Sequence, residues 1–345
     1  DEMEWDSYLD NSSRGTAFHS LKWKKIIDKS FGFESSYFVI RNDCGELLGI
    51  CPFYITNKLY PIKILDSLPN SDMGGPLLND PLDGTAAMAL RNHIKEIGSR
   101  KGLTYARLNL MDNELCFKLK ESDSRVDTSS GIMTLDLDDK PIESIWNNQF
   151  NHKIKQYINR FERDGFSTRL GKNMDDMYKF INLYKSNMSK AGFDCNSAFF
   201  LNMFEILYPE NLNIILIEKD QTCIGAGLSL VYKNKNGKNL YMVGVGLDKS
   251  ISSRYKIYYK LRWETIKYAS EIKCKSISLG PTLFDENEIH HRMKAKFGAE
   301  FKQCYILYIP LNKNLFALRE SSLALGRIFR DKMPLKIKNQ IFNRL

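Results

Sequence analysis

The fold is decided by Ser276-Ile-Ser-Leu-Gly280-Pro-Thr-Leu-Phe-Asp-Glu-Asn-Glu-Ile-His-His-Arg-Met-Lys294-Ala-Lys-Phe297-Gly298. This stretch starts as a short β-like run, stops at a Gly-Pro breaker, and then carries an acidic patch and a histidine pair. It closes on Lys-x-x-Phe-Gly before the next β-like run, residues 304–309. Sites are often built on strand-end loops that gather glycine, proline and polar side chains. We therefore expect the functional site close to this stretch.

The composition is that of a folded globular protein with room for two domains. The chain has 345 residues, of which 43% are hydrophobic and 26% are charged. It has no apolar run of about eighteen residues, the length that a membrane helix needs. Acidic residues at positions 1, 2, 4 and 6 do not fit a signal peptide. We therefore expect a cytoplasmic protein.

The seven cysteines form no C-x-x-C pair and are odd in number. This pattern favours reduced thiols over a disulfide framework, and it argues against a zinc site. We expect no metal.

The net charge of +9 is concentrated in the last residues of the chain. From residue 312 onward, eight Lys or Arg face two acids, which leaves +6 in this tail. A basic tail can contact RNA phosphates or an anionic membrane surface. The alternative is a solvated basic helix that packs on the body of the protein.

One order of elements occurs twice along the chain. Each copy has a predicted hairpin followed by a strand, a helix and a second strand. In the first copy these are residues 37–55, 62–65, 85–97 and 103–110. In the second copy they are residues 214–232, 240–245, 253–271 and 275–279.

Predicted helices precede each hairpin, at residues 20–30 for the first and 142–163, 174–189 and 198–207 for the second. The pattern indicates two copies of one α/β (α+β) unit, each a mixed sheet covered by helices. We assign residues 1–135 to the first domain, 136–310 to the second, and 311–345 to a basic helical tail.

Several short motifs follow one another in a characteristic order. They are Met73-Gly74-Gly75-Pro76-Leu77, the strand at residues 131–137, Trp146 followed by basic residues and Gly165, residues 261–269, Ser278-Leu-Gly280, and Met293-Lys294-x-x-Phe297-Gly298. Together they resemble the FemAB-like branch of the Gcn5-related acyltransferases over residues 20 to 310. The sequence departs from this family where Met293 replaces an aromatic residue and Pro281 replaces a glycine. The long helical arm of some peptidoglycan-bridge members has no room between residues 240 and 271.

The resemblance implies a tandem duplicated acyl-CoA N-acyltransferase fold with a substrate cleft between its domains. It also implies acyl transfer to an amine of a small-molecule, nucleotide-linked or cell-envelope acceptor, without a covalent enzyme intermediate. No tightly bound cofactor is implied. The co-substrate is either an aminoacyl-tRNA or an acyl-CoA or other acyl thioester.

One turn bears on the choice between these donors. Gcn5-like enzymes usually hold the coenzyme A pyrophosphate with a glycine-rich loop at a helix start, whose backbone N–H groups point at the phosphates. The corresponding turn here, residues 248–256, contains no glycine. It therefore favours an aminoacyl-tRNA or an unusual thioester over acetyl-CoA.

Three residues are candidates for catalysis. Lys294 occupies the position of the family's functional lysine, and its ammonium suits a charge that develops on the oxyanion of the transition state. The alternative is an ordinary surface lysine. His290 or His291 has the pKa range of a general base, although adjacent histidines in a polar loop are more often solvated or capping. Asp285 is expected to cap the helix that follows.

Eight further residues are candidates for substrate binding. Gly74, Gly75, Gly280 and Phe297 belong to the family motifs. Lys153 and Lys155 lie on a basic helix that either grips phosphates or is an exposed charged face. Arg254 and Lys256 lie at a predicted helix start, where positive charge is unfavourable unless an anion binds there.

Three hypotheses of function follow. The first is a FemAB-like N-acyltransferase acting on an envelope or nucleotide-linked amine, with a possible tRNA partner. The second is a thioester-dependent N-acyltransferase of envelope or exopolysaccharide synthesis. The third is a non-catalytic module that binds an anionic partner. The sequence leaves the acceptor and the oligomeric state open.

Overall fold

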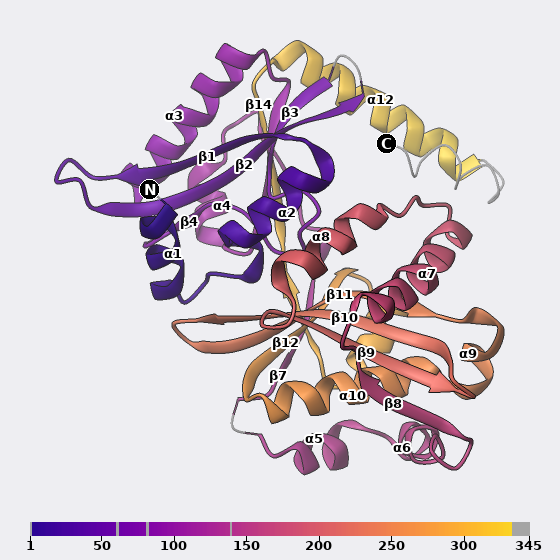
Figure 1. Cartoon of the computed structure of the whole chain (residues 1–345). Helices are drawn as coiled ribbons and strands as arrows, with labels where there is room; N and C mark the ends of the chain where they lie inside the picture. The colour runs from indigo at the N-terminus through magenta and orange to yellow at the C-terminus, as the bar shows by residue number, and fades with distance from the viewer. Residues whose placement is uncertain (1, 60–61, 81–82, 139, 333–345) are drawn as a thin grey trace. The chain divides into compact units, whose positions relative to one another are not determined.

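The chain forms two compact units, each built around one mixed sheet (Figure 1). The computed structural model describes residues 2–59, 62–80, 83–138 and 140–332. The first unit comprises Asp1–Leu21, Gly32–Ser130 and Gln303–Leu345, and the second comprises Lys22–Phe31 and Gly131–Lys302. The predicted fold of two helix-covered mixed sheets is confirmed.

The units do not follow the predicted domain boundaries in two places. Helix α2, Leu21–Phe31, packs on the second unit, where the rings of Trp23 and Phe31 lie 5.6 and 5.3 Å from that of Phe199. Strand β14, Tyr305–Pro310, pairs antiparallel with β5 of the first unit. In both places, apolar residues are buried against a part of the chain that is distant in sequence. The order of residues alone does not reveal such partners.

The sheet of the first unit runs in the order β1-β2-β3-β5-β14-β6, and β4 pairs with β2. The predicted hairpin is β1 and β2, and the predicted strand–helix–strand is β3, α3 and β5. The remaining strands have the bounds β1 Glu34–Arg41, β2 Leu47–Leu59, β3 Ile62–Ser67, β4 Leu77–Leu78, β5 Tyr105–Leu110 and β6 Arg125–Asp127.

Helices cover both faces of this sheet. Leu90 and Ile94 of α3, Gly84–Lys101, pack with α4, Asn113–Leu119, on one face. On the other face Phe316 of α12, Lys313–Lys332, packs against Tyr105 and Tyr308. Two short helices, α1 at Glu2–Asn11 and the 3-10 turn η1 at Ala17–His19, complete the unit.

Helix α3 does not end at Gly98, as the sequence suggests. It continues to its C-cap, Gly102, which takes the left-handed conformation at φ +64°. Gly98 is needed for packing instead, because a Cβ there would lie 2.8 Å from Leu311.

The sheet of the second unit runs in the order β13-β7-β12-β11-β10-β9-β8. Its strands include the predicted hairpin β9–β10 and the predicted strands β7, β11 and β12. Their bounds are β7 Ser130–Asp136, β8 Phe166–Leu170, β9 Leu212–Lys219, β10 Thr222–Asn234, β11 Gly237–Leu247, β12 Cys274–Leu283 and β13 Glu300–Gln303.

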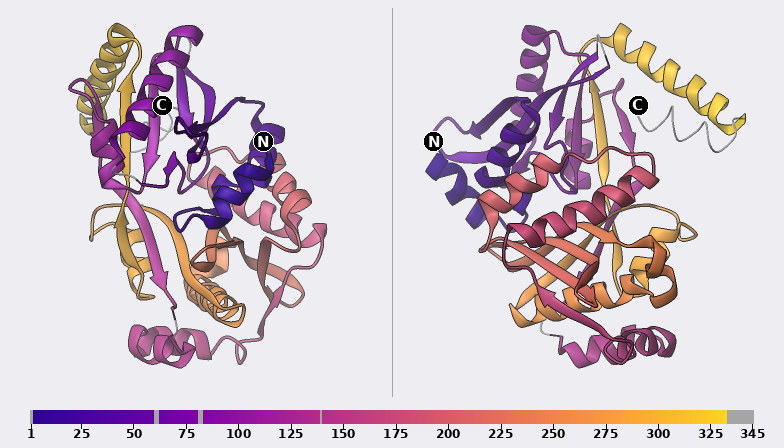
Figure 2. Two further views of the ribbon diagram at one scale, coloured as in Figure 1. Left: turned by 90° about the vertical axis from the view of Figure 1, so that its left-hand side faces the viewer. Right: turned by 45° about the vertical axis from the view of Figure 1, so that its right-hand side comes forward.

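Helix α10, Ile257–Glu271, lies on one face of this sheet with α6, and α7, Met174–Lys190, lies on the opposite face with α8 (Figure 2). Glycines in the strands allow the helices to approach the two faces of the sheet closely. Gly227 of β10 faces Leu261 of α10, whereas Gly244 of β11 faces Phe180 of α7. The other helices are α5 Ile142–Gln149, α6 His152–Asn159, α8 Ser197–Leu207, α9 Lys249–Tyr255 and α11 Ile289–Ala295.

Two predicted helices are each broken in two. The helix expected over residues 142–163 divides into α5 and α6, because the Asn151 side chain caps α6 by accepting from the Ile154 N–H at 3.0 Å. The helix expected over residues 253–271 divides at Lys256 into α9 and α10. Both breaks fall at residues that the helical spacing of apolar side chains does not reveal.

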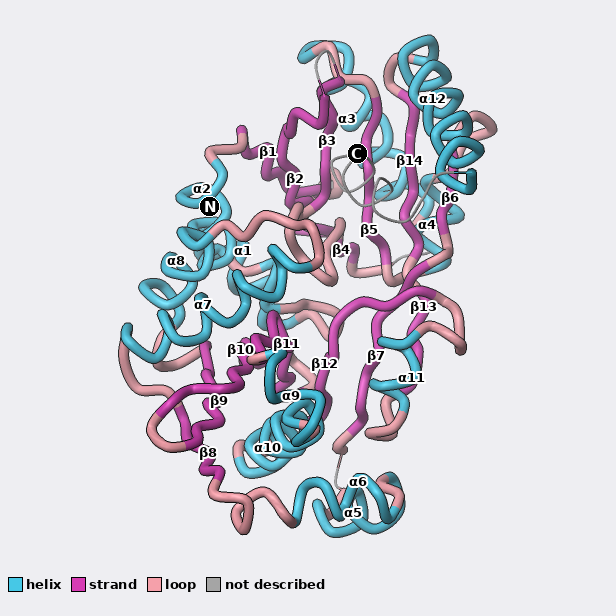
Figure 3. Tube along the Cα trace, turned by 90° about the vertical axis from the view of Figure 1, so that its right-hand side faces the viewer, coloured by secondary structure: helices cyan, strands magenta, loops and turns pink. Residues whose placement is uncertain are grey.

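The parallel strands β11 and β12 separate along their length. They pair only between Lys238–Tyr241 and Cys274–Ser278, at the start of each strand. Beyond these residues β11 also shifts its register against β10, between Leu228 and Ser229. Figure 3 shows these two strands with α9 and α10 beside them and α11 on the other side of β7. β-Bulges bend the strand locally and are frequent next to active sites.

Candidate functional site

A pocket of about 640 Å³ lies in the second unit, next to the region where β11 and β12 separate. Its wall is formed by α6, the last residue of β11, the α9–α10 junction, and α11. All of these elements belong to the second unit. The pocket therefore lies beside the stretch that the sequence singles out.

The pocket is strongly electropositive. Four cations line it, Lys153, Lys256, Arg292 and Lys296, and its lining includes no Asp or Glu. Among the described residues, none of the four takes part in an ion pair. Four unpaired cations around one concave surface raise the local concentration of anions. The pocket is therefore suited to a ligand that carries phosphates or carboxylates.

The start of α10 adds to this potential. Lys256 takes the left-handed conformation, at φ +57° and ψ 40°, and no side chain caps the helix. Of the N–H groups of the first helical turn, that of Tyr259 donates to the Lys256 carbonyl oxygen at 2.9 Å, and the turn carries the positive end of the helix dipole. Ser252, Ser253 and Lys256 line the pocket in front of this helix start. Such an arrangement is a ready anion site even though the turn contains no glycine.

Aromatic rings form another part of the wall. Tyr157 and Tyr259 stack with their centroids 6.0 Å apart. Behind them Phe297 is fully buried, with its ring centroid 6.0 Å from that of Tyr258 and 5.8 Å from that of Tyr259. Phe297, a predicted substrate-binding residue, therefore packs behind Tyr258 and Tyr259, and both of these tyrosines line the pocket.

Lys294 is buried at the end of β12. Its ammonium group donates to the carbonyl oxygens of Gly280, at 3.0 Å, and Pro281, at 2.6 Å. Gly280 has φ +83°, which turns the chain where β12 has already lost its pairing with β11. Lys294 therefore holds a fixed positive charge at the open end of the strand, while Met293 and Lys296 on either side line the pocket.

The histidine pair lies away from the pocket. The His291 ring stacks on Phe301, with centroids 5.7 Å apart, and its Nδ1 lies 3.4 Å from the Leu283 carbonyl oxygen. His290 is exposed, and neither histidine lines the pocket. The cap of α11 is Glu288 rather than Asp285, because the Glu288 carboxylate accepts from the His291 N–H at 2.8 Å.

The predicted basic residues divide into two groups. Lys153 and Lys256 line the pocket. Lys155 instead donates to the Asn147 carbonyl oxygen at 3.3 Å, and the Arg254 guanidinium lies over the Tyr255 ring at 5.3 Å. Lys155 and Arg254 are therefore engaged on the surface outside the pocket.

Gly74 and Gly75 lie in the first unit, in a loop that needs residues without side chains. A Cβ on Gly75 would lie 2.6 Å from the Asn109 carbonyl oxygen, and one on Gly74 would lie 2.5 Å from Leu68 Cβ. Buried His19 holds the loop, with Nε2 3.0 Å from the Gly75 carbonyl oxygen. Burial lowers the pKa of His19 to about 4, so the neutral ring donates to this carbonyl from Nε2.

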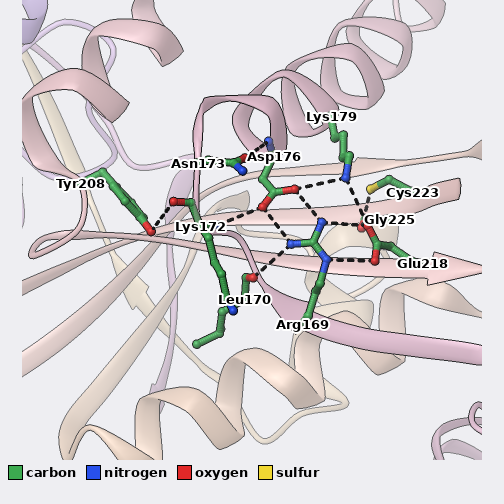
Figure 4. A network of polar contacts seen from close by, with 10 residues as sticks. All are labelled: Arg169, Leu170, Lys172, Asn173, Asp176, Lys179, Tyr208, Glu218, Cys223 and Gly225. Atoms are coloured by element: carbon green, nitrogen blue, oxygen red, sulfur yellow. Dashed lines mark hydrogen bonds and ion pairs between the residues drawn. The ribbon is translucent and has the colours of Figure 1, made fainter. Parts of the chain in front are cut away.

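A separate polar network ties the edge of the second sheet to α7 (Figure 4). Arg169 of β8 pairs with Asp176 at 2.6 Å and with Glu218 at 2.9 Å. Lys179 contacts the same two carboxylates. Hydrogen bonds from Arg169 hold the pKa values of Asp176 and Glu218 below their usual range. Because these charges neutralise one another, we assign the network a structural role.

Sequence analysis did not single out Arg292, Tyr258 or Tyr259, which line the pocket, nor buried Arg262 of α10. The sequence does contain a sign that Arg262 is buried. Arg262 lies four residues before Ile266, and therefore on the same apolar face of the helix. Within the described ranges, no cluster of His, Cys, Asp or Glu is arranged to hold a metal ion. None of the described helices combines the length and apolarity that crossing a membrane requires.

The basic tail packs on the first unit over its described part. Lys313 pairs with Asp123 at 2.8 Å, and the Arg319 guanidinium lies 4.7 Å from the Tyr105 ring centroid. Lys336, Lys338 and Arg344 lie outside the described residues. The described part therefore matches the expectation of a basic helix packed on the body.

Known structures share this fold along nearly the whole chain, whereas the sequence matches no protein-family model and no curated protein. FemX aligns with a TM-score of 0.71 at 13% identity, covering 92% of this chain and 98% of that chain. The C-terminal domain attributed to a lysylphosphatidylglycerol synthetase of Agrobacterium fabrum aligns at 0.59 and 11% identity, covering 93% and 96%. A tandem GNAT protein of the clavulanic acid pathway aligns at 0.55 and 10% identity, covering 89% and 91%. The similarity establishes the tandem Gcn5-like fold, and a fold does not by itself specify a substrate.

Proposed function

We propose that this protein is a FemAB-like N-acyltransferase that moves an acyl or aminoacyl group from a phosphate-bearing carrier to an amine. The observation that carries the proposal is the pocket of the second unit. It combines four unpaired cations with the uncapped start of α10, next to the open end of β11 and β12. This combination suits the phosphates of a carrier, and the strand opening leaves room for the group attached to it.

The names of the similar structures support an acyl-transfer reaction. FemX and the lysylphosphatidylglycerol synthetase domain point to aminoacyl transfer, and the tandem GNAT protein, whose structure is described as being without AcCoA, points to acyl transfer more generally. Aminoacyl-tRNA is therefore our first candidate donor. The acceptor we propose is an amine of an envelope precursor or of a nucleotide-linked small molecule.

The reaction needs no covalent enzyme intermediate. The acceptor nitrogen attacks the carbonyl carbon of the donor, the carbonyl oxygen becomes an oxyanion, and a C–N bond forms. The C–O bond of an aminoacyl ester, or the C–S bond of a thioester, then breaks. The amine loses one proton and the leaving oxygen or sulfur gains one. The protein contributes orientation and stabilisation of the oxyanion.

Lys294 is the residue we propose to stabilise this oxyanion. Its ammonium is buried at the open end of β12, where its position is set by the carbonyl oxygens of Gly280 and Pro281. A charge fixed in this way needs no reorganisation when the transition state forms. His290 and His291 are weaker candidates for the general base, because His290 is exposed and the His291 ring stacks on Phe301.

A specific observation favours an acyl thioester as a second candidate donor. The absence of glycine from residues 248–256 argues against standard coenzyme A binding. However, Lys256 adopts the left-handed conformation that a glycine would favour and leaves the start of α10 uncapped. The geometry of a pyrophosphate site is thus compatible with this sequence.

A donor assay with a small acceptor tests the proposal without knowledge of the natural acceptor. Purified protein is incubated with hydroxylamine and either a mixture of aminoacyl-tRNAs or a set of acyl-CoAs, and hydroxamate formation is measured. We expect Lys256→Asp to reduce donor affinity about 100-fold, because it reverses a pocket charge and caps the anion-binding helix start. The matched control is Lys249→Asp, the same charge change at an exposed residue outside the pocket.

Two results would contradict the proposal. If Lys256→Asp and Lys249→Asp weaken donor binding equally, the pocket is not the donor site. If carrier phosphates bind but no donor yields hydroxamate, and extracted envelope precursors are not acylated either, the protein is an anion-binding module. Lys294→Met separates binding from catalysis, since we expect it to lower turnover with little change in donor affinity.

A further inference from the structure

Helix α10 buries two cations whose surroundings differ. The side chains of Lys260 and Arg262 are 6% and 5% exposed. The Lys260 ammonium pairs with the Glu264 carboxylate at 2.9 Å. Among the described residues, the Arg262 guanidinium contacts the Met242 sulfur and the Tyr258 ring, at 5.0 Å from the ring centroid, and its buried Nε has no hydrogen-bond partner there. No carboxylate in the described part of the chain pairs with Arg262.

Burial of a charge without a counter-ion is strongly unfavourable, and buried charges in proteins are therefore normally paired. The fold supplies a partner to Lys260 but not to Arg262, two residues further along the same helix. An anion from outside the chain would supply the partner that the fold does not. A guanidinium is suited to this role because its planar fork binds a carboxylate or phosphate through two parallel hydrogen bonds.

The position of Arg262 connects it with the pocket. Tyr258 lies four residues earlier on the same helix face, and it lines the pocket. Met242 is the first residue of β11 beyond the last one paired with β12. The guanidinium therefore lies behind the pocket wall, at the point where the two strands separate. Lys153, Lys256, Arg292 and Lys296 lie around the pocket itself.

We propose that Arg262 is a binding residue for a carboxylate carried by the transferred acyl group. The substrate class would then be an acidic acyl or aminoacyl donor. The pocket cations already suit the carrier phosphates, and Arg262 lies at the strand opening where the transferred group would lie. One isolated guanidinium balances the single charge of a carboxylate, whereas a phosphate monoester carries up to two charges. This assignment rests on the proposed donor site.

Carrier-free ligands test the assignment independently of catalysis. Succinate, butyrate and inorganic phosphate are titrated into the full-length protein by calorimetry, because succinate and butyrate have similar lengths but differ in one terminal carboxylate. We expect wild-type protein to bind succinate roughly tenfold more tightly than butyrate. Arg262→Met should abolish this difference, and Arg262→Lys, which keeps the charge but not the fork, should retain part of it.

Stability measurements without ligand separate a ligand-binding arginine from a structural one. Arg262→Met removes an uncompensated buried charge, so we expect its unfolding midpoint to equal or exceed that of wild type. The matched control Lys260→Met removes one of the two lysines that pair with Glu264, leaving Lys267 at 2.7 Å, and should unfold earlier than wild type. An equal loss of stability in both variants would overturn the proposal.

Two binding outcomes would also overturn the assignment. The first is equal binding of succinate by wild type and Arg262→Met. The second is dependence of phosphate binding, rather than succinate binding, on Arg262, which would make the anion a phosphate of the carrier. Failure of the hydroxamate assay would leave these binding results unaffected, so the two proposals can fail separately.

Discussion

The two units repeat one strand–helix–strand element but treat its charges differently. In the first unit β3 and β5 flank α3, and the Asp83 carboxylate caps this helix by accepting from the N–H groups of Thr85 and Ala86 at 2.9 and 3.1 Å. In the second unit α9 and α10 lie between β11 and β12. The Asp248 carboxylate caps α9 by accepting from the Ser250 N–H at 2.9 Å, whereas Lys256 leaves the start of α10 without a side-chain cap. The start of α10 thus lacks the capping carboxylate that α3 has, and this is the helix start at which we propose that an anion binds.

A related contrast holds for two arginines at different places in the two units, Arg107 on β5 and Arg262 on α10. Asp66 of β3 and Arg107 of β5 are register partners, and Arg107 Nε lies 2.8 Å from the fully buried Asp66 carboxylate. Arg262 in the second unit has no such partner among the described residues. Under our proposal, one copy of the duplicated fold pairs its buried charges internally and the other keeps a site for a ligand.

The largest effect we expect comes from Arg107→Met, which should destabilise the protein by about 3 kcal/mol. The substitution leaves the Asp66 carboxylate buried, with 0% exposure, beside an apolar side chain. Urea unfolding followed by circular dichroism measures the change. Lys101→Met, which removes a pair whose side chains are 43% and 55% exposed, is the control and should change stability by less than about 0.5 kcal/mol. A small loss of stability in Arg107→Met would contradict the difference that we expect between this variant and Arg262→Met.

A smaller effect concerns the paired charges at the edge of the second sheet. Hydrogen bonding to Arg169 lowers the pKa of Asp176 below its usual value of 3.8. A carboxylate with a lowered folded-state pKa stabilises the protein above the unfolded pKa, and this contribution is lost as the pH falls towards the folded pKa. We expect wild type to lose about 2 kcal/mol from this group below pH 4.

Asp176→Asn tests the origin of this acid sensitivity. The variant should be less stable than wild type at pH 6, and the difference should shrink as the pH is lowered through 3.8. Urea titrations at several pH values measure both quantities. A difference that does not vary with pH would mean that the loss comes from packing and not from the charge of Asp176.

The smallest effect we expect is that of Asp83→Ala, which removes the cap of α3. Loss of an N-cap carboxylate destabilises a protein by about 1 kcal/mol. Thermal unfolding measures the loss, with Asp83→Asn as a control that keeps the capping oxygen. A more informative readout is anion binding. If Asp83→Ala creates a phosphate site in the first unit, the cap alone distinguishes the two helix starts.

Much of the fold could be predicted from sequence because it is encoded locally. The alternation of apolar runs with turn residues located both hairpins, and the repeated order of elements indicated two copies of one unit. Local signals also placed Lys153 and Lys256 among the anion-binding candidates, and both line the pocket. Lys294 was found through the family motif and not through its spacing, and its catalytic role stays a prediction.

The remaining features depend on packing between residues that are distant in sequence. Helix breaks at Asn151 and Lys256 interrupt apolar patterns that would otherwise continue. The pairing of β14 with β5 and the contact of Trp23 with Phe199 join segments about 200 or 175 residues apart. Local periodicity shows which face of an element is apolar. It does not show which distant segment covers that face, because this depends on the tertiary packing.

Sequence by itself determined the number, type and order of the repeated elements, and the excess of positive charge, because these follow from residue pattern and composition. Only the tertiary structure decided which cations remain without a partner. Arg107 and Arg262 are equally charged in the sequence, and the difference between them is that an aspartate lies opposite one and a methionine opposite the other. That difference arises from the register of strands and the packing of a helix, and it is the physical basis for assigning the ligand site to the second unit.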